Sequence, residues 1–424
     1  MVAKISSSLL PDNTTISEDG MIVFAGVRAD DLAKEYGTPL FVYDEEHIRQ
    51  RCREAVNAFP DGVSYAAKAF LSKAMACLAF EEGMGLDVAT MGEAYVALQA
   101  GVPARKLTLH GNNKSFEELQ YAMDKGIGKI VIDSFDEIAK IEQLFSAGDT
   151  PIKALIRITP GVEAHTHEYI TTGEEDSKFG FTLSTGLAEK AIDIVKNSQA
   201  IELIGIHAHI GSQVFTEESF RKSTETLAEL ANRFSLPELC VGGGLGVPYL
   251  NDESSISIAE WGEIVRQVCE ERGVTAQITA EPGRSIVASA AVTLYTIGTI
   301  KELEGIRTYV AVDGGMHDNP RPALYGSGYE TFLARDTGSE RDMPITLVGK
   351  HCESGDVLVR DGSIPSSAAI GDLLVTPVTG AYGHSMGSNY NKVLRPAVVF
   401  VKSGKAELVV RRESLEDLLA TDMG

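Results

Sequence analysis

The feature that most constrains the fold is a repeated alternation of short apolar runs with amphipathic stretches between about residues 61 and 286. Eight runs have the length and β-branched content of strands: SYAAK, LDVA, LTLHG, KIVIDS, ALIRIT, IGIHAHIG, ELCVGGG and QITAEPG. Helical patterns lie between them, such as Phe116, Leu119 and Met123, which are spaced three and four residues apart. Eight consecutive strand–helix units predict an α/β protein with a parallel (β/α)8 barrel.

The pattern changes after residue 287, where strand-like runs with Gly, Pro and Asp turns replace the alternation. Helical patterns are nearly absent there until SLEDLLA near the end of the chain. We therefore predict a C-terminal all-β domain at 287–424, completed by the N-terminal segment 1–42, whose run MIVFAGV also has the character of a strand. The barrel, at 43–286, would then be an insertion in this β-domain.

Composition limits the classes of partner. The chain has 424 residues, of which 44% are hydrophobic and 23% charged, and its formal net charge is −22. Such a charge repels phosphates, which argues against nucleic acid or an anionic membrane surface as a partner. No apolar run is long enough to span a bilayer, and the opening MVAKISSSLL is too short and weakly apolar for a signal peptide. We expect a cytoplasmic protein.

The five cysteines are scattered, and no two of them form a CxxC pair. This spacing indicates neither a disulfide framework nor a zinc knuckle. We expect Cys52, Cys77, Cys240 and Cys269 to be small buried hydrophobic residues. On its own sequence context, Cys352 would also be assigned as a buried structural thiol.

Polar residues stand at the ends of nearly all the predicted strands. In a parallel barrel the active site forms at the C-terminal ends of the strands. The residues at these ends are Lys68, Asp87, His110 with Asn112 and Asn113, Arg157, His207, His209, Ser212, the glycines of GGGLG (242–246) and EPGR (281–284). A lysine, a carboxylate, imidazoles, a glycine loop and an arginine therefore meet at one rim, which predicts a functional site.

The lysine and the glycine loop each have two readings from the residues alone. Lys68 stands among small apolar residues, so it either extends to water or is placed to react, because burial lowers the pKa of an amine. Asp87 would push that pKa the other way. GGGLG is either an ordinary turn or a backbone that approaches a phosphate closely and donates N–H groups to it.

The residues alone also leave undecided what the histidines do and what Glu281 and Arg284 do. The pair His207 and His209, or the HTH run at 165–167, could hold a metal ion, although no acid-rich cluster at zinc-type spacing accompanies them. His209 is better suited to lie as an aromatic plate against a flat cofactor. Glu281 and Arg284 could form a plain structural ion pair.

The chain resembles one enzyme family over nearly its whole length. The motifs that carry the resemblance are YAAKAF, DVAT with GE, HGNNKS, HAHIGSQ, GGGLG, EPGR, DGGMHDNPRPALYG, HCESGD and GAYGHSMGSNYN. Their order and content identify the chain as a member of the diaminopimelate decarboxylase family, whose members carry pyridoxal 5'-phosphate on a barrel with an added β-domain. The resemblance implies decarboxylation of meso-2,6-diaminopimelate to L-lysine and CO2, the last step of bacterial lysine biosynthesis.

The resemblance also implies a set of cofactor-binding residues. Lys68 would hold the cofactor as an internal aldimine, His209 would stack on the pyridine ring, and Glu281 would pair with the pyridine nitrogen. A carboxylate in that place keeps the nitrogen protonated, which suits a decarboxylase. The remaining contacts would come from Asp87, Ser212, Gly243, Gly244, Gly283, Arg284 and Tyr382.

A second implied set would bind the substrate and complete the reaction. Its members are Arg284, Arg321, Tyr325, Glu353 and Tyr382. Arginine would hold the carboxylate at the end of the substrate that is not decarboxylated, and Glu353 would hold its ammonium. Cys352 would be the proton donor and, with Glu353, would reach the site from the other subunit of a homodimer.

Two histidines depart from the family pattern. His317 stands where the family usually has a small residue, and we expect it either to perturb the local pH dependence or to point outward. His384 occupies a variable aromatic position.

Three alternatives remain to this reading. The first is a decarboxylase of the same fold that acts on ornithine, arginine or a carboxylated polyamine. The second is a non-catalytic cofactor-carrying protein, against which the segment 288–424 with HCESGD argues. The third is a metal-dependent barrel hydrolase built on the paired histidines.

Overall fold

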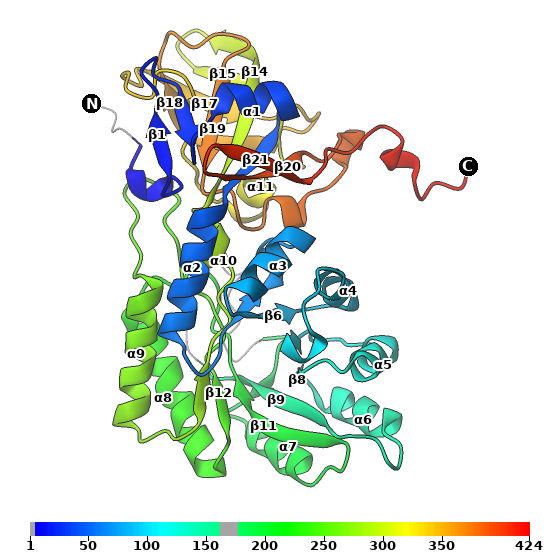
Figure 1. Cartoon of the computed structure of the whole chain (residues 1–424). Helices are drawn as coiled ribbons and strands as arrows, with labels where there is room; N and C mark the ends of the chain where they lie inside the picture. The colour runs from blue at the N-terminus through cyan, green and yellow to red at the C-terminus, as the bar shows by residue number, and fades with distance from the viewer. Residues whose placement is uncertain (1–4, 162–176) are drawn as a thin grey trace. The chain divides into compact units, whose positions relative to one another are not determined.

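The structure, a computed structural model, describes residues 5–161 and 177–424, so the HTH run at 165–167 lies outside the described residues. The chain divides into two compact units (Figure 1). One unit consists of Met1–Gln50, Val247–Ser254 and Ile286–Gly424, and the other of Arg51–Gly246 and Ser255–Ser285. We refer to them as the β-unit and the barrel unit.

Eight parallel strands form the centre of the barrel unit, in the order β13-β12-β11-β9-β8-β7-β6-β5. Their bounds are β5 (Ser64–Ala66), β6 (Gly85–Val88), β7 (Leu107–Leu109), β8 (Lys129–Ile132), β9 (Ile152–Thr159), β11 (Ile201–His207), β12 (Glu238–Cys240) and β13 (Gln277–Thr279). The Ser64 N–H donates to the Ala280 carbonyl at 2.9 Å and the Ala66 N–H to the Pro282 carbonyl at 3.0 Å, which closes the first strand onto the last. The predicted barrel is confirmed, with one unpredicted addition, β10 (Phe181–Thr182), which pairs with β9.

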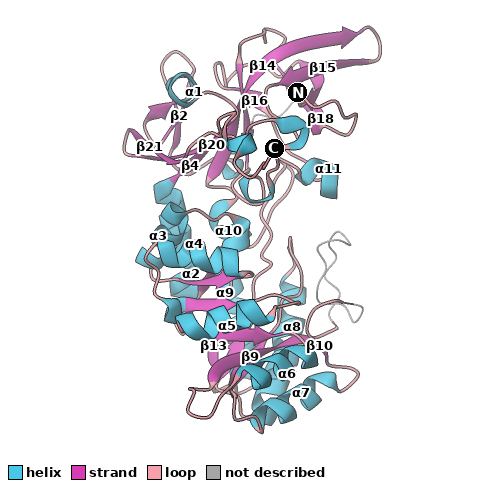
Figure 2. Ribbon diagram, turned by 90° about the vertical axis from the view of Figure 1, so that its right-hand side faces the viewer, coloured by secondary structure: helices cyan, strands magenta, loops and turns pink. Residues whose placement is uncertain are grey.

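A helix follows each of these eight strands in the chain (Figure 2). The helices are α3 (Lys73–Glu81), α4 (Met91–Gln99), α5 (Phe116–Lys125), α6 (Phe135–Leu144), α7 (Leu187–Lys196), α8 (Glu217–Phe234), α9 (Ile258–Glu271) and the short α10 (Arg284–Val287), and α2 (Glu45–Ala58) precedes the first strand. Ser115 and Ser257 begin α5 and α9 with capping boxes, which satisfy N–H groups that the first helical turn leaves unpaired. Trp261 of α9 is fully buried and contacts the ring of Phe220 of α8 at 5.6 Å between centroids.

The β-unit is built on a large mixed sheet in the order β18-β17-β15-β14-β4-β20-β21, with β19 paired to β14 and β16 paired to β19. The bounds are β4 (Leu40–Asp44), β14 (Ala291–Leu303), β15 (Arg307–Val312), β16 (Phe332–Leu333), β17 (Met343–Val348), β18 (Val357–Ile364), β19 (Leu373–Pro377), β20 (Ala397–Lys402) and β21 (Lys405–Val410). The N-terminal segment completes this sheet, as predicted, because β4 pairs with both β14 and β20.

The segment MIVFAGV contributes to the β-unit in a different way. It forms β2 (Ile22–Phe24) in a separate sheet with β1 (Thr14–Ile16) and β3 (Val27–Arg28), followed by α1 (Ala29–Tyr36). Its buried Ile22 and Phe24 belong to the same apolar core as residues of β4 and β14. The strand within the large sheet is the fully buried run LFVYD, which we did not identify from the sequence.

Two local expectations are wrong. SLEDLLA forms only a single 3-10 turn, η7 (Asp417–Leu419), and Leu415 and Leu419 are exposed. Cys52, Cys240 and Cys269 are buried as expected, but Cys77 is half-buried and Cys352 is exposed. In the part of the chain that the structure describes, no helix combines the length and apolar character needed to cross a membrane.

Candidate active site

Lys68 directly follows β5, in the 3-10 turn η2 (Ala67–Ala69). The hydroxyl of Tyr65 donates to the Phe70 carbonyl at 2.8 Å and accepts from the Phe70 N–H at 3.1 Å, which fixes this turn at both ends. Ala67 and Ala69 are fully buried. The side chain of Lys68 is exposed, so the expectation that burial among alanines desolvates its amine is wrong.

Three acidic or imidazole groups lie within electrostatic reach of the Lys68 amine. Burial raises the pKa of Glu93, and the positive charge of Lys68 opposes that rise. Burial lowers the pKa of His209, and the charge of Lys68 lowers it in the same direction. Burial raises the pKa of Asp87 to about 6, and the nearby His110 and Lys68 only partly offset that rise. The lysine therefore shares this rim with two carboxyl groups and an imidazole.

Glu281 is the most strongly held group at the rim. It is buried, and its two carboxylate oxygens lie 3.0 Å from Nε2 of His110 and 2.9 Å from Nε2 of His207. An ionised carboxylate only accepts hydrogen bonds, so both imidazoles donate to it. Burial alone would raise the pKa of Glu281, but the two imidazoles outweigh burial and hold that pKa well below its usual range. The structure thus keeps a buried anion at this end of β13.

His110 and His207 were recognised in the sequence as residues at strand ends, but their role was missed. They are the partners of Glu281, separated from it by 171 and 74 positions. The donor atoms of these three residues lie within 4.8 Å of one another, as they would around a metal ion. The pair His207 and His209, considered from the sequence as an alternative metal site, is not this group, since His207 is directed at Glu281.

His209 lies two residues beyond the end of β11 and is half-buried. Its Nδ1 accepts from the N–H of Gly243 at 3.3 Å. Burial, followed by the charges of Lys68 and Arg157, lowers the pKa of His209 well below its usual range. The ring is therefore neutral and oriented by the glycine loop.

The glycine loop needs its glycines for close backbone packing. Gly242 and Gly244 have φ values of 67° and 107°, which L side chains rarely adopt. A Cβ at Gly243 would lie 2.3 Å from the carbonyl oxygen of Glu281, and one at Gly244 would lie 2.4 Å from that of Gly211. The loop therefore brings bare backbone next to the strand end that bears Glu281.

Arg284 and Ser212 lie together at the same rim. Nη2 of Arg284 donates to Oγ of Ser212 at 2.8 Å, although the two residues are 72 positions apart. Arg284 is buried, and it begins the short helix α10. A Cβ at Gly283 would lie 2.9 Å from the Cβ of Ala66, so this glycine permits close packing against the strand that leads to Lys68. Guanidinium, hydroxyl and glycine backbone together suit an anion such as a phosphate.

A buried ionic group supports the strand ends next to this rim. Nζ of Lys114 lies 2.8 Å from Oε1 of Glu137 and donates to the main-chain carbonyls of Gly111 and Val131, each at 2.7 Å. Arg157, whose role was also missed, packs its guanidinium 4.3 Å from the ring centroid of Phe179. These contacts hold the loops after β7, β8 and β9 in place.

The predicted substrate residues Arg321, Tyr325 and Tyr382 belong to the β-unit. Arg321 begins helix α11 (Arg321–Tyr325) and is buried, with its guanidinium 4.2 Å from the ring centroid of Tyr249 and Nη1 donating to the Tyr329 hydroxyl at 2.5 Å. Tyr382 has a φ of 61°, a left-handed backbone that is costly for an aromatic residue.

Cys352 and Glu353 lie on the loop between β17 and β18, and both are exposed. The assignment of Cys352 as a buried structural thiol is therefore wrong. Glu353 lines a cavity of about 590 Å³, together with Met316, Tyr329 and other residues of the β-unit. The structure thus presents a thiol and a carboxylate side by side on one surface loop.

The side chains at the barrel rim match the chemical groups of pyridoxal phosphate. The rim offers an exposed amine for the aldehyde, a neutral half-buried imidazole for the ring face, and a buried anion for the ring nitrogen. Ser212, Arg284 and the glycine backbone offer donors for the phosphate. The aldehyde, the ring face, the ring nitrogen and the phosphate of the cofactor therefore each have a matching group at the rim.

Comparisons with known proteins agree with this fit. The family described as "Pyridoxal-dependent decarboxylase, pyridoxal binding domain" matches residues 45–288. The fold and the site thus define the chain as a pyridoxal-dependent decarboxylase, an enzyme that uses pyridoxal phosphate.

Similar proteins, some of them with known structures, show which pyridoxal-dependent decarboxylases the chain belongs to. The diaminopimelate decarboxylase of Bacillus subtilis is 47% identical over 96% of both chains, and that of Mycobacterium tuberculosis is 43% identical over 99% of this chain and 98% of its own. The crystal structure of the M. jannaschii diaminopimelate decarboxylase matches with a TM-score of 0.91 and 30% identity, over 97% of this chain and 98% of that one, and it has also been solved with L-lysine. The chain belongs to the diaminopimelate decarboxylases and is a carboxy-lyase.

Proposed function

We propose that this enzyme decarboxylates meso-2,6-diaminopimelate to L-lysine and CO2, with Lys68 as the residue that holds the cofactor and Cys352 as the proton donor. The observation that carries the proposal is the arrangement at the barrel rim, where the exposed Lys68 amine, the neutral His209 ring and the buried Glu281 anion follow three different strands. The 47% identity to the Bacillus subtilis diaminopimelate decarboxylase supports the substrate.

Each residue has a defined task. Pyridoxal phosphate, when bound, takes up the electron pair left on the α-carbon as CO2 departs. Glu281, held anionic by His110 and His207, keeps a proton on the ring nitrogen. His209 orients the ring by its face, and Ser212 and Arg284 bind the phosphate.

The proton balance requires a proton donor, and we propose Cys352 for this task. The bond from the α-carbon to the carboxylate breaks, and a bond from the α-carbon to hydrogen takes its place. The thiol of Cys352 supplies that proton and regains one from solvent. The exposure of Cys352 suits a group that acts on the substrate of a neighbouring subunit, and we propose a homodimer in which Cys352 and Glu353 complete the partner's site.

Arginine and glutamate at the distal end of the substrate determine specificity. A diaminopimelate molecule carries a carboxylate and an ammonium at the end that does not react. Arg321 would bind the carboxylate and Glu353 the ammonium, since a guanidinium matches a carboxylate in two hydrogen bonds. Ornithine lacks the distal carboxylate and would leave a buried guanidinium without its anion.

Two measurements test the proposal. Borohydride reduction of the cofactor-loaded enzyme, followed by peptide mapping, should find the modified lysine at position 68, and the Lys68→Ala variant should give no labelled peptide. Modification of another lysine, such as the buried Lys114, would refute the assignment of Lys68. Incubation with meso-diaminopimelate should yield lysine and CO2, whereas preferential turnover of ornithine, arginine or a carboxylated polyamine would identify a different substrate.

A further inference from the structure

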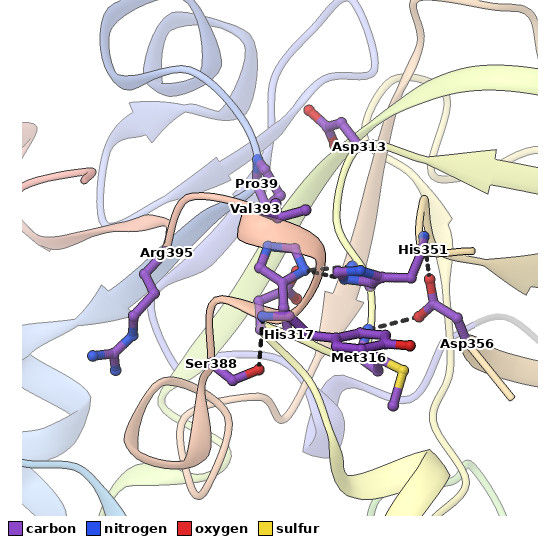
Figure 3. A network of polar contacts seen from close by, with 12 residues as sticks. Pro39, Asp313, Met316, His317, His351, Asp356, Ser388, Val393 and Arg395 are labelled. Carbon is purple, nitrogen blue, oxygen red and sulfur yellow. Dashed lines mark hydrogen bonds and ion pairs between the residues drawn. The ribbon is translucent and has the colours of Figure 1, made fainter. Parts of the chain in front are cut away.

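His317 is fully buried. Figure 3 shows it next to His351, which lies on the loop that carries Cys352 and Glu353. His317 does not point outward, which corrects one of the two expectations from the sequence. Its ring lies 4.9 Å from that of His351, with 68° between the planes, and Nδ1 of His317 lies 2.9 Å from Nε2 of His351. His351 immediately precedes Cys352, so this contact reaches the loop directly.

The hydrogen-bond pattern determines which histidine donates. Oδ1 of Asn391 accepts from the main-chain N–H of Cys352 at 3.3 Å, so an oxygen, not the amide nitrogen, faces that N–H. The same oxygen lies 3.1 Å from Nδ1 of His351, which must therefore carry a hydrogen. In neutral His351 the other nitrogen, Nε2, is then an acceptor. Nδ1 of His317 is left as the donor.

A second contact joins the loop between β17 and β18 to the segment that contains His317. Oδ2 of Asp356 accepts from the N–H of His351 at 2.9 Å, and Oδ1 accepts from the N–H of Met316 at 2.6 Å. The N–H of Asp356 in turn donates to the Glu353 carbonyl at 3.1 Å. Figure 3 shows His317, His351, Met316 and Asp356 joined in this way. Both ends of the loop are thus fixed to residues 316 and 317.

We propose that His317 is a positioning residue for the proton donor: by donating from Nδ1 to His351, it fixes the tautomer through which His351 and Asn391 hold the backbone of Cys352. This inference rests on the proposed function, in which Cys352 supplies the proton. This arrangement costs free energy of folding, because Nε2 of the buried His317 has no hydrogen-bond partner among the described residues.

The groups around His317 keep its ring neutral, so that Nδ1 remains the donor to His351. Burial, followed by the charges of His351, Lys350 and Arg412, lowers the pKa of His317 to about 4. Among the acidic groups near it, Asp318 lies 3.5 Å from Nδ1, Asp356 accepts from the N–H groups of His351 and Met316, and Asp313 acts on the neighbouring Arg412. His317 is therefore neutral near pH 7 and available as a single donor.

The test compares three single variants by hydrogen exchange of the peptide that contains residues 350–356. His317→Leu removes the donor, and we expect exchange in this peptide to rise about tenfold or more, because the Cys352 N–H loses its fixed acceptor. His317→Asn keeps a side-chain N–H close to the position of Nδ1 and should restore exchange to within about threefold of the unchanged enzyme. Asn391→Ala, at an exposed residue, should reproduce the effect of His317→Leu from the other end of the contact.

The outcomes separate this inference from the proposed function. Exchange in peptides of the barrel unit, such as that with Cys77, should stay unchanged, whereas a rise throughout the chain would show general destabilisation and overturn the inference. It would also be overturned if His317→Leu left the 350–356 peptide unchanged, or if His317→Asn behaved like His317→Leu. With the cofactor bound, kcat of His317→Leu should fall about tenfold with little change in KM. If Cys352→Ala retains full activity, the proposed proton donor is wrong, while the exchange result still decides the role of His317.

Discussion

Glu281 shows how single residues set the chemistry of the barrel rim. It is a buried carboxylate that stays ionised because His110 and His207 each donate one N–H to it. Nδ1 of His207 has no hydrogen-bond partner among the described residues, so the polar function of this ring is its bond to Glu281. Removing the ring should therefore act on Glu281 and not on a wider network.

The His207→Leu variant should shift the pH profile of the enzyme. The ionised form of Glu281 loses one of its two donors, so the pKa of Glu281 rises from its depressed value. Glu281 is ionised only above its pKa, so the acid limb of kcat should move to higher pH than in the unchanged enzyme, with kcat at neutral pH about tenfold lower. The measurement is kcat from about pH 5 to 9. His207→Gln retains an N–H donor and should keep the original profile; superimposable acid limbs for the Leu variant would contradict this role of His207.

The residues of the site were predictable to different degrees. Lys68, Glu281 and His209 could be placed at one rim because each follows a strand, and the topology of a parallel barrel brings such ends together. The partnership of Glu281 with His110 and His207 could not be identified, because it spans 171 and 74 positions across the barrel. The exposure of Lys68 was one of two possibilities left open by the sequence, and the buried Ala67 and Ala69 on either side favoured the other one.

At the scale of elements, strands were easier to predict than the places where they pair. The eight barrel strands are short apolar runs between clear helical patterns, so each was identified. The run LFVYD of β4 was missed because it lies directly before α2, where no turn separates it from the barrel unit. SLEDLLA has a helical pattern, but Leu415 and Leu419 are 70% and 63% exposed, and a helix this short does not persist without packing.

The Gly243→Ala variant tests the close approach of the glycine loop to the end of β13. The new Cβ would lie 2.3 Å from the carbonyl oxygen of Glu281, so the loop or the strand end must shift. We expect the affinity for pyridoxal phosphate to fall by about tenfold or more, because a shift of about 1 Å misplaces the phosphate donors. Titration of the variant with the cofactor, followed by visible absorbance, measures this loss.

Gly92→Ala is the matched control for that variant. Gly92 lies at the start of α4 in the same unit, and its Cβ would meet only Oγ1 of Thr90, at an ordinary 3.7 Å. Alanine there should leave the cofactor affinity unchanged and stabilise the fold by about 0.5 kcal/mol or more. Equal affinities for the two alanine variants would show that the loop adapts without cost.

The functional groups of the chain are divided between its two units. The groups that match the cofactor belong to the barrel unit, whereas Cys352, Glu353 and Arg321 belong to the β-unit. If one site takes its lysine from one chain and its thiol from the partner, each inactive variant lacks a different half of every site. A mixed dimer then regains one complete site.

Mixing Lys68→Ala chains with Cys352→Ala chains tests this arrangement. With equal amounts and free exchange of subunits, about half of the dimers are hybrids, and each hybrid joins Lys68 of one chain to Cys352 of the other in one of its two sites. About one quarter of the unchanged activity should therefore return. If each chain instead builds its site from its own residues, every site in a hybrid lacks either the lysine or the thiol, and no activity returns. Native mass spectrometry of the mixture establishes whether hybrids have formed. A mixture that contains hybrids but shows no decarboxylase activity counts against the shared site.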